Sequence, residues 1–180
     1  RRVLFRSSLK ALANSNLNFQ VDTKYFTQRV VLGDPANAHF QSQPLGNLAA
    51  NVSGDRLTKL VDKWFKGADV PVAADPSLPT LRYQATQGSL FVNGPSYEDL
   101  DQGNVGDCYF LAALGTVAQH RPSTILNMFG DNGDGTWSVR FYRGNTPVYV
   151  TVNRMLPVLG LSPPGVDPST VAGQPWAAGF

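Results

Sequence analysis

Residues 99–119 read Asp99-Leu-Asp-Gln-Gly-Asn-Val-Gly-Asp-Cys-Tyr-Phe-Leu-Ala-Ala-Leu-Gly-Thr-Val-Ala-Gln119 and contain the single cysteine of this 180-residue chain, Cys108. Beyond Cys108, apolar residues recur at three- and four-residue steps, at Phe110, Leu111, Leu114, Val117 and Ala118. This spacing predicts a helix of about three turns with one buried face. Before it, Gly103 and Gly106 predict a loop that turns sharply into the helix, with Asp107 as its N-cap.

Cys108 therefore falls in the first turn of the predicted helix. Unpaired backbone N–H groups and the positive end of the helix dipole favour a thiolate there, which is the nucleophilic form of cysteine. Gln102, six residues upstream, carries a side-chain amide that can join the Cys108 N–H as an oxyanion hole. The alternative is that Cys108 is a small apolar residue buried in a core helix. The residues alone leave both interpretations open.

The run Gln102-Gly-x-x-Gly-Asp-Cys-Tyr-x-Leu-Ala-Ala113 resembles the active-site signature of the calpain family of cysteine proteases. Calpains of animals usually have Trp after the nucleophile, where this chain has Tyr109. Ser89–Gly94 resembles the family's lead-in strand, and Trp137–Pro157 resembles its paired strands. The resemblance covers roughly residues 85 to 157 and is closest to bacterial calpain-like proteins.

The resemblance implies an α+β chain: the nucleophile subdomain of a papain-like cysteine proteinase fold, with a small antiparallel sheet. It implies that Cys108 is the nucleophile of a cysteine endopeptidase acting on protein or peptide substrates, and that Gln102 contributes to the oxyanion hole. In the family, His and Asn of the catalytic triad come from a second subdomain, which we expect to follow this chain. We therefore expect the 180-residue chain alone to be inactive and to need the remainder of the catalytic domain.

The resemblance also implies a calcium site. The positions that match the family's ligands are Val92, Gly94 and Asp99, and oxygen donors suit Ca²⁺. A further carboxylate ligand of the family would lie beyond this chain, so the set here is incomplete.

Two other functions remain open beside proteolysis. One is a catalytically silent calpain-like module for binding or assembly, which a search for His and Asn beyond Phe180 would distinguish. The other is a β-rich surface domain, which leaves the spacing of Gln102 and Cys108 unexplained.

Composition limits the partners. Fifteen basic and thirteen acidic residues give a net charge of +2 without a basic block, so we expect no nucleic-acid partner. No apolar run is long enough to span a bilayer, and no signal peptide is recognisable. One cysteine excludes an internal disulfide and leaves the compartment, cytoplasmic or secreted, open.

We expect two regions. Residues 1–79 form a flanking region whose first seven residues have the character of a cloning or sequencing scar. Within it, residues 55–67 predict an amphipathic helix with an Asp cap, a Gly stop and core residues Trp64 and Phe65. A strand is expected around Tyr25–Leu32. Prolines 71, 76 and 79 mark a linker, and residues 80–180 form the truncated catalytic domain.

Within the second region we expect strands at 81–84 and 90–92, a short helix at 123–129 and a hairpin of 136–142 with 148–152. Asp131-Asn-Gly-Asp-Gly135 predicts a turn rather than an EF-hand, since Tyr142 stands where Glu is required. Glu98, Asp99, Asp101 and Asp107 predict a solvated acidic loop, although carboxylates near Cys108 would oppose its ionisation. His120 is expected at the far end of the nucleophile helix and His39 at the surface.

Overall fold

The structure of the chain is a computed structural model that describes residues 7, 8, 10, 11, 13–15, 20–50, 52–70, 81–100 and 106–159. The chain forms two compact units. The first unit is Arg1–Val72 with Gly130–Asn153, and the second unit is Ala73–Phe129 with Arg154–Phe180. The boundary predicted at residue 79 divides the chain differently, because segment 130–153 returns to the first unit.

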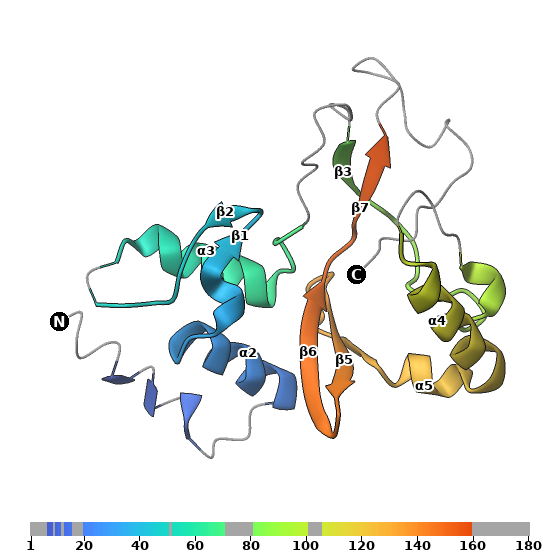
Figure 1. The fold of residues 1–180 in the computed structure, drawn as a ribbon, viewed down its shortest axis with the longest axis horizontal. Coiled ribbons are helices and arrows are strands. Elements are labelled where there is room, and N and C mark those ends of the chain that lie inside the picture. Colours follow the sequence, from blue (N-terminus) through green and yellow to red (C-terminus); the bar gives the residue numbers. More distant parts are fainter. Residues whose placement is uncertain are drawn as a thin grey trace. The chain divides into compact units, whose positions relative to one another are not determined.

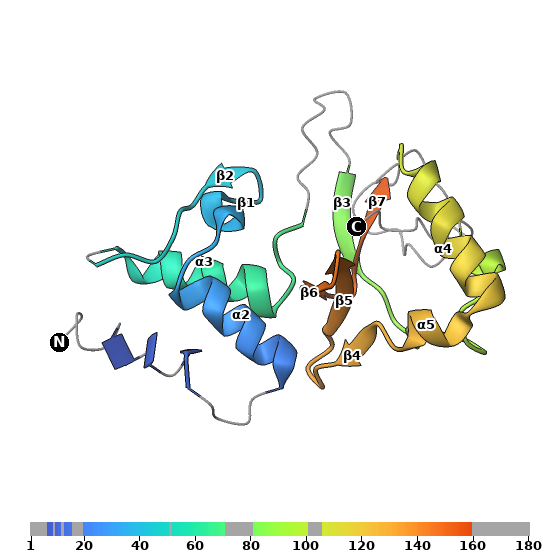
Figure 2. The ribbon, with the colours of Figure 1, turned by 60° about the horizontal axis from the view of Figure 1, so that its bottom comes forward.

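The first unit is built around helices α2 (Val21–Val31) and α3 (Gly54–Phe65), which lie side by side (Figures 1 and 2). Leu60 of α3 is completely buried and packs with Val30 and Val31 of α2. Trp64 and Phe65 pack against the same cluster, which confirms them as core residues. Burial of such apolar side chains is worth about 1.5–3 kcal/mol each when complete, so the contact between these two helices stabilises the unit.

A buried asparagine, Asn37, joins α2 to α3 by hydrogen bonds. After α2 the chain forms the 3₁₀ helix η1 (Pro35–Ala38) and the short strands β1 (His39–Phe40) and β2 (Gln43–Pro44). Asn37, in η1, is fully buried, donates to the Arg29 carbonyl (2.9 Å) and to Asn47 Oδ1 (2.8 Å), and accepts from Trp64 Nε1 (2.7 Å). These bonds satisfy the amide, as burial of a polar group requires.

A three-stranded sheet has the order β4 (Phe129–Asp131), β5 (Trp137–Arg143) and β6 (Thr146–Val152), and β5 and β6 pair antiparallel. The β5–β6 hairpin turns at Gly144-Asn145 and pairs Val139 with Val150, which confirms the predicted hairpin. On β6, the Tyr149 ring meets the rings of Tyr25 and Phe26 of α2 at centroid distances of 5.4 and 6.5 Å. The hairpin therefore belongs to the first unit through aromatic packing.

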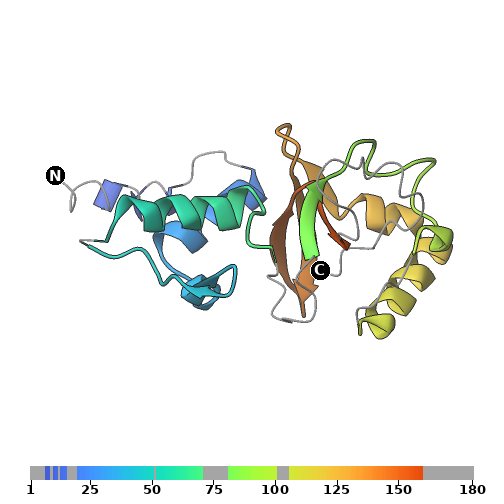
Figure 3. The ribbon, with the colours of Figure 1, turned by 90° about the horizontal axis from the view of Figure 1, so that it is seen from above.

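The second unit contains a two-stranded antiparallel sheet, β3 (Leu81–Ala85) with β7 (Met155–Leu159), which lie side by side in Figure 2. It also contains the 3₁₀ helix η2 (Tyr97–Asp99) and the helices α4 (Cys108–His120) and α5 (Pro122–Leu126). The chain changes direction between α4 (yellow-green) and α5 (orange) in Figure 3. The break falls at Arg121, whose successor Pro122 cannot continue the α4 hydrogen-bond ladder.

The mixture of helices and small antiparallel sheets confirms the α+β class, while the papain-like fold stays a prediction. The α4 helix and the strand at 81–84 are confirmed, and the helix expected at 123–129 is α5, which ends at Leu126 because Phe129 enters β4. The predicted turn at 131–135 is also confirmed.

Three predicted details are wrong. The strand around Tyr25–Leu32 is helix α2, because Phe26 and Val30, four residues apart, share its buried face. Residues 90–92 form no strand, since Val92 is 73% exposed and Asn93 and Gly94 take positive φ. The N-cap position of α3 is occupied by Ser53, two residues before the expected Asp55, which lies in the first turn of the helix.

Within the described ranges, no helix combines the length and apolar character needed to cross a bilayer.

Candidate functional site

Cys108 is the first residue of α4 and its side chain is exposed. Asp107 occupies the N-cap position, and its carbonyl accepts hydrogen bonds from the N–H groups of Phe110 (2.9 Å) and Leu111 (3.1 Å). The thiol therefore lies at the positive end of a thirteen-residue helix and is open to an incoming substrate. This placement is inconsistent with the alternative of a sealed core cysteine.

The Asp107 side chain does not complete the predicted cap. It makes no capping hydrogen bond, and its Oδ1 is buried without a partner among the described residues. The N–H groups in the first turn are thus left without that carboxylate, so they stay available to stabilise negative charge near the sulfur.

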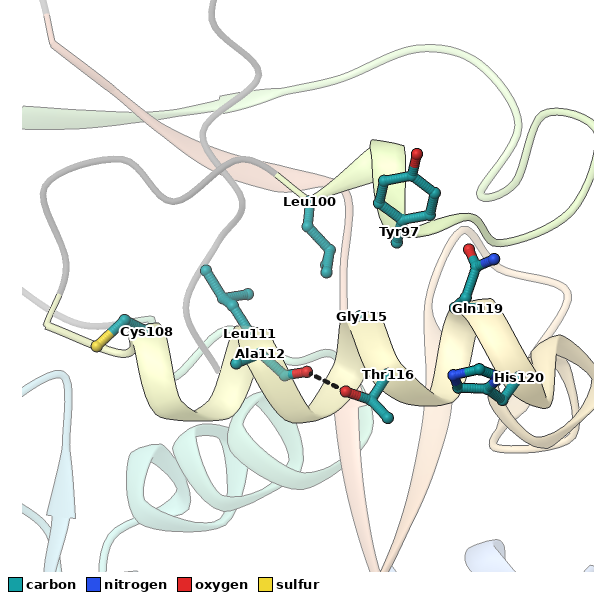
Figure 4. A pocket seen from close by; sticks show the side chains of 9 residues that line it. All are labelled: Tyr97, Leu100, Cys108, Leu111, Ala112, Gly115, Thr116, Gln119 and His120. Carbon is teal, nitrogen blue, oxygen red and sulfur yellow. Dashed lines mark hydrogen bonds between the residues drawn. The ribbon is translucent and has the colours of Figure 1, made fainter.

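An open groove of about 690 Å³ runs along α4 from Cys108 to His120 (Figure 4). Tyr97 and Leu100 line it from the side of η2, and Leu111 and Thr116 line it from α4. The Leu100 methyl group comes within 2.9 Å of the position that a Cβ on Gly115 would occupy. Gly115 therefore permits the close approach of η2 to the nucleophile helix. The glycine inside the apolar pattern of the helix was the sequence signal for this contact, and it was not recognised.

Gln102, the predicted oxyanion-hole residue, and Asp101 lie outside the described residues. The backbone N–H of Cys108 is in place at the helix start, but the second donor of the pair stays a prediction.

The two histidines lie where the sequence predicted. His120 is the last residue of α4, and twelve residue steps at about 1.5 Å each separate it from Cys108 by about 18 Å along the helix axis. Figure 4 shows the two residues at opposite ends of the groove. His39 is exposed in β1 of the first unit, where its carbonyl accepts from Lys63 Nζ (3.1 Å). His120 is therefore unable to act as a general base for Cys108, since that role requires hydrogen-bond distance.

The acidic residues before the nucleophile make local contacts. The Asp99 Oδ2 atom accepts from the Ser96 N–H (2.7 Å), and Ser96 Oγ accepts from the Glu98 N–H (3.2 Å), which together cap η2. The Glu98 carboxylate accepts from the Tyr97 hydroxyl (3.2 Å). The loop is thus ordered by its own carboxylates, which is more structure than the predicted solvated loop.

The three residues that match the calcium ligands are only partly suited to a cation. Val92 and Gly94 offer carbonyl oxygens in an exposed turn, a donor type that Ca²⁺ accepts, while one oxygen of Asp99 is already bonded to Ser96. Three residues fall short of the six to eight oxygens that Ca²⁺ takes. Among the described residues, no cluster of three or more His, Cys, Asp or Glu side chains could hold a metal ion.

An exposed cysteine at a helix start, beside an open groove, is the arrangement of a thiol hydrolase nucleophile. The profile of the calpain family cysteine proteases matches residues 64–166, more than half of the chain. The chain therefore belongs to the calpain family of cysteine proteases.

Two curated relatives agree with this assignment. Calpain-13 of Rattus norvegicus is 33% identical over 93 residues, which cover 46% of this chain and 14% of the relative. The calpain-type cysteine protease DEK1 of Zea mays is 26% identical over 121 residues, which cover 67% of this chain and 5% of the relative. The chain thus spans a small part of these relatives' lengths. No solved structure matches significantly.

Proposed function

We propose that this chain carries the nucleophile of a cysteine endopeptidase whose complete form extends beyond these 180 residues. The observation that supports this most directly is the exposed Cys108 thiol at the first residue of α4. In the proposed reaction the Cys108 sulfur attacks the carbonyl carbon of a peptide bond, and a tetrahedral oxyanion forms. The Cys108 N–H and the Gln102 amide donate hydrogen bonds to that oxyanion, which can be worth about 2.7–4 kcal/mol for a single donor.

A thiol protease of this type also needs an imidazole that takes the thiol proton and returns it to the leaving amine. His120 lies at the wrong end of α4 for this role. We propose that the base, and the amide that orients it, come from a part of the protein outside this sequence. The 180-residue chain alone should then leave casein uncleaved, and cleavage that depends on Cys108 would contradict the proposed division of the active site.

The assignment of Cys108 is tested in the complete protein. Replacement of Cys108 by Ala should lower the rate of peptide cleavage by a factor on the order of a thousand or more, because no neighbouring side chain can attack the peptide bond in place of the sulfur. Cys108→Ser is the isosteric companion, and thermal unfolding of both variants should match that of the parent. Peptide cleavage that survives in a folded Cys108→Ala variant would remove the nucleophile assignment.

The binding or assembly module is the competing proposal. It would be favoured if the complete sequence lacked a histidine and an asparagine after Phe180, or if the folded parent cleaved no peptide under any condition. Alkylation of Cys108 by iodoacetamide at neutral pH then measures whether the thiol still behaves as a nucleophile.

We further propose that calcium binds near Val92, Gly94 and Asp99 in the complete protein, with added ligands from elsewhere. The bound ion would supply positive charge that offsets the carboxylates before Cys108. The Asp99→Asn variant should bind calcium more weakly in a calorimetric titration, while Glu98→Gln, next to it in η2, should bind as the parent does. Equal calcium affinity in all three proteins would exclude this location.

A further inference from the structure

The sequence contains two Asn-Gly pairs, Asn93-Gly94 and Asn132-Gly133. In such a pair the backbone nitrogen of glycine can attack the side-chain Cγ of asparagine, because glycine has no side chain to hinder the approach. The new bond between nitrogen and Cγ closes a succinimide ring as the Cγ–Nδ2 bond breaks, and the amide nitrogen leaves as ammonia with the proton of the glycine N–H. Water then opens the ring at either carbonyl and leaves aspartate or isoaspartate.

The first pair is free to react. Asn93 is exposed and has a φ of 62°, and Gly94 follows with a φ of 87°. Neither residue makes a hydrogen bond to the part of the chain that the structure describes. The space where a Gly94 side chain would stand is open, with no heavy atom within 4 Å. The Asn93 amide can therefore rotate toward the Gly94 nitrogen without breaking a contact.

Both residues of the second pair are exposed, but they are held in place by hydrogen bonds. The Asn132 Nδ2 donates to Thr136 Oγ1 (2.9 Å), and Asn132 Oδ1 accepts from Ser138 Oγ (3.0 Å). The attacking group is held as well, since the Gly133 N–H donates to Asp131 Oδ1 (2.8 Å). Ring closure at Asn132 requires that all three bonds be broken first.

We propose that Asn93 is a site of spontaneous deamidation in this protein and that Asn132 is protected by its hydrogen bonds. The modification places a new carboxylate in the segment between β3 and η2, and the isoaspartate product lengthens the main chain there by one methylene group. Both changes fall upstream of the residues that pack against α4, and neither depends on the proposed protease activity.

The folded chain is incubated at mildly alkaline pH, digested with chymotrypsin and sequenced by fragmentation mass spectrometry. Conversion at Asn93 should be faster than at Asn132 by on the order of a hundredfold, because each of the three bonds contributes roughly a factor of five. Enzymatic methylation of isoaspartate should label the Asn93 peptide in the parent and not in Asn93→Gln. Equal rates at the two sites in the folded protein would overturn the proposal.

A second measurement separates protection by the fold from effects of local sequence. In concentrated urea, where the fold is lost, the rates at Asn93 and Asn132 should converge. In the folded protein, Thr136→Val and Ser138→Ala should each accelerate conversion at Asn132 and leave Asn93 unchanged. A difference between the sites that persists in urea, or an Asn132 rate that neither variant raises, would contradict protection by these bonds.

Discussion

Gly67 shows how one residue can determine the end of a helix and its contact with a strand. It follows the C-cap Lys66 of α3, has a φ of 57°, and packs so closely on β6 that a Cβ there would lie 2.7 Å from the Thr151 carbonyl oxygen. Both the backbone conformation and the space select glycine at this position. The predicted stop of the helix thus has a second role that periodicity does not reveal.

Replacement of Gly67 by Ala should destabilise the protein by about 2 kcal/mol or more, since left-handed φ and a backbone clash add together. Urea denaturation measures the change as a lower midpoint with an unchanged slope. Gly54→Ala is the control, because Gly54, in the first turn of the same helix, has nothing within 4 Å. Equal midpoints for the two variants would show that neither the left-handed φ of Gly67 nor its close contact with Thr151 selects glycine.

Asp134, in the turn between β4 and β5, is an exposed carboxyl whose ionisation is changed by the fold. The Thr136 hydroxyl donates to Asp134 Oδ1, and this bond, together with one from the Thr136 N–H, holds the pKa of Asp134 below its ordinary value against a weaker effect of burial. A carboxyl whose pKa is lowered by folding stabilises the fold above its unfolded pKa, and the contribution is lost as pH falls through the folded pKa. The turn should therefore weaken in acid.

Thr136→Val should raise the pKa of Asp134 toward its ordinary value, because the donating hydroxyl is gone. Thr136→Ser keeps the hydroxyl and is the matched control. Titration of the Asp134 side chain by NMR measures both variants. A pKa in the valine variant that stays as low as in the parent would mean that the hydroxyl is not the cause.

At the scale of elements, the sequence predicts those whose pattern is complete within one segment. The α4 helix shows its apolar face between Cys108 and His120, and the β5–β6 hairpin has alternation on both sides of a glycine turn. Both were predictable because local periodicity and long-range packing agree. The same periodicity left the exposure of Cys108 open, because a cysteine in the first turn of a helix can lie either in a cleft or in the core, and the structure shows it exposed.

Other elements depend on partners that are distant in sequence. Residues 25–32 carry short alternation and also an i, i+4 pair, and burial of Phe26 and Val30 in the first unit decides in favour of the helix. Strand β7 contains Pro157, which lacks an N–H and weakens the local strand signal, and its partner β3 is distant in the sequence. The close approach of Leu100 to Gly115 also joins two elements: the glycine in α4 indicates that something packs closely there, but it does not indicate which residue.

A buried hydrogen bond joins the end of α3 to strand β6. Its removal measures how much such a long-range contact contributes to stability. Thr151 is 7% exposed and its Oγ1 donates to the Trp64 carbonyl at 2.6 Å. That carbonyl lies in the last turn of the helix, where no intrahelical donor remains. Thr151→Val keeps the shape and removes the donor, so it should lower the free energy of unfolding by about 1–3 kcal/mol.

The neighbouring Val150, which is 43% exposed, provides the inverse substitution. Val150→Thr adds a hydroxyl where water can solvate it and should change stability by no more than about 0.5 kcal/mol. Thermal unfolding of both variants measures the difference. A larger loss in Val150→Thr than in Thr151→Val would show that the bond to Trp64 is not what fastens β6 to α3.

At the scale of the whole molecule, the division into compact units departs from the division that prolines suggested. Segment 130–153 lies in the second predicted region, but its aromatic and hydrogen-bond partners Tyr25, Phe26 and Trp64 lie in the first. The family profile also begins at Trp64, inside α3, before the predicted boundary. A linker signal marks where the chain is locally extended, and it carries no information about which segments return to pack together.

A chain cut at the predicted boundary therefore tests the two divisions against each other. In a protein of residues 80–180 alone, the backbone amides of β5 and β6 should be poorly protected from hydrogen exchange. A small sheet needs a packed face, and α2 and α3 would be absent. Amide hydrogen exchange at Val139 and Thr151, buried in the complete chain, should be faster in the shortened protein by several orders of magnitude. Exchange at Ala118 in α4 is the internal reference, since this residue belongs to the second unit. If Val139 and Thr151 kept the protection that they have in the complete chain, the hairpin would be stable without the first unit, and residues 80–180 would be the domain that the sequence predicted.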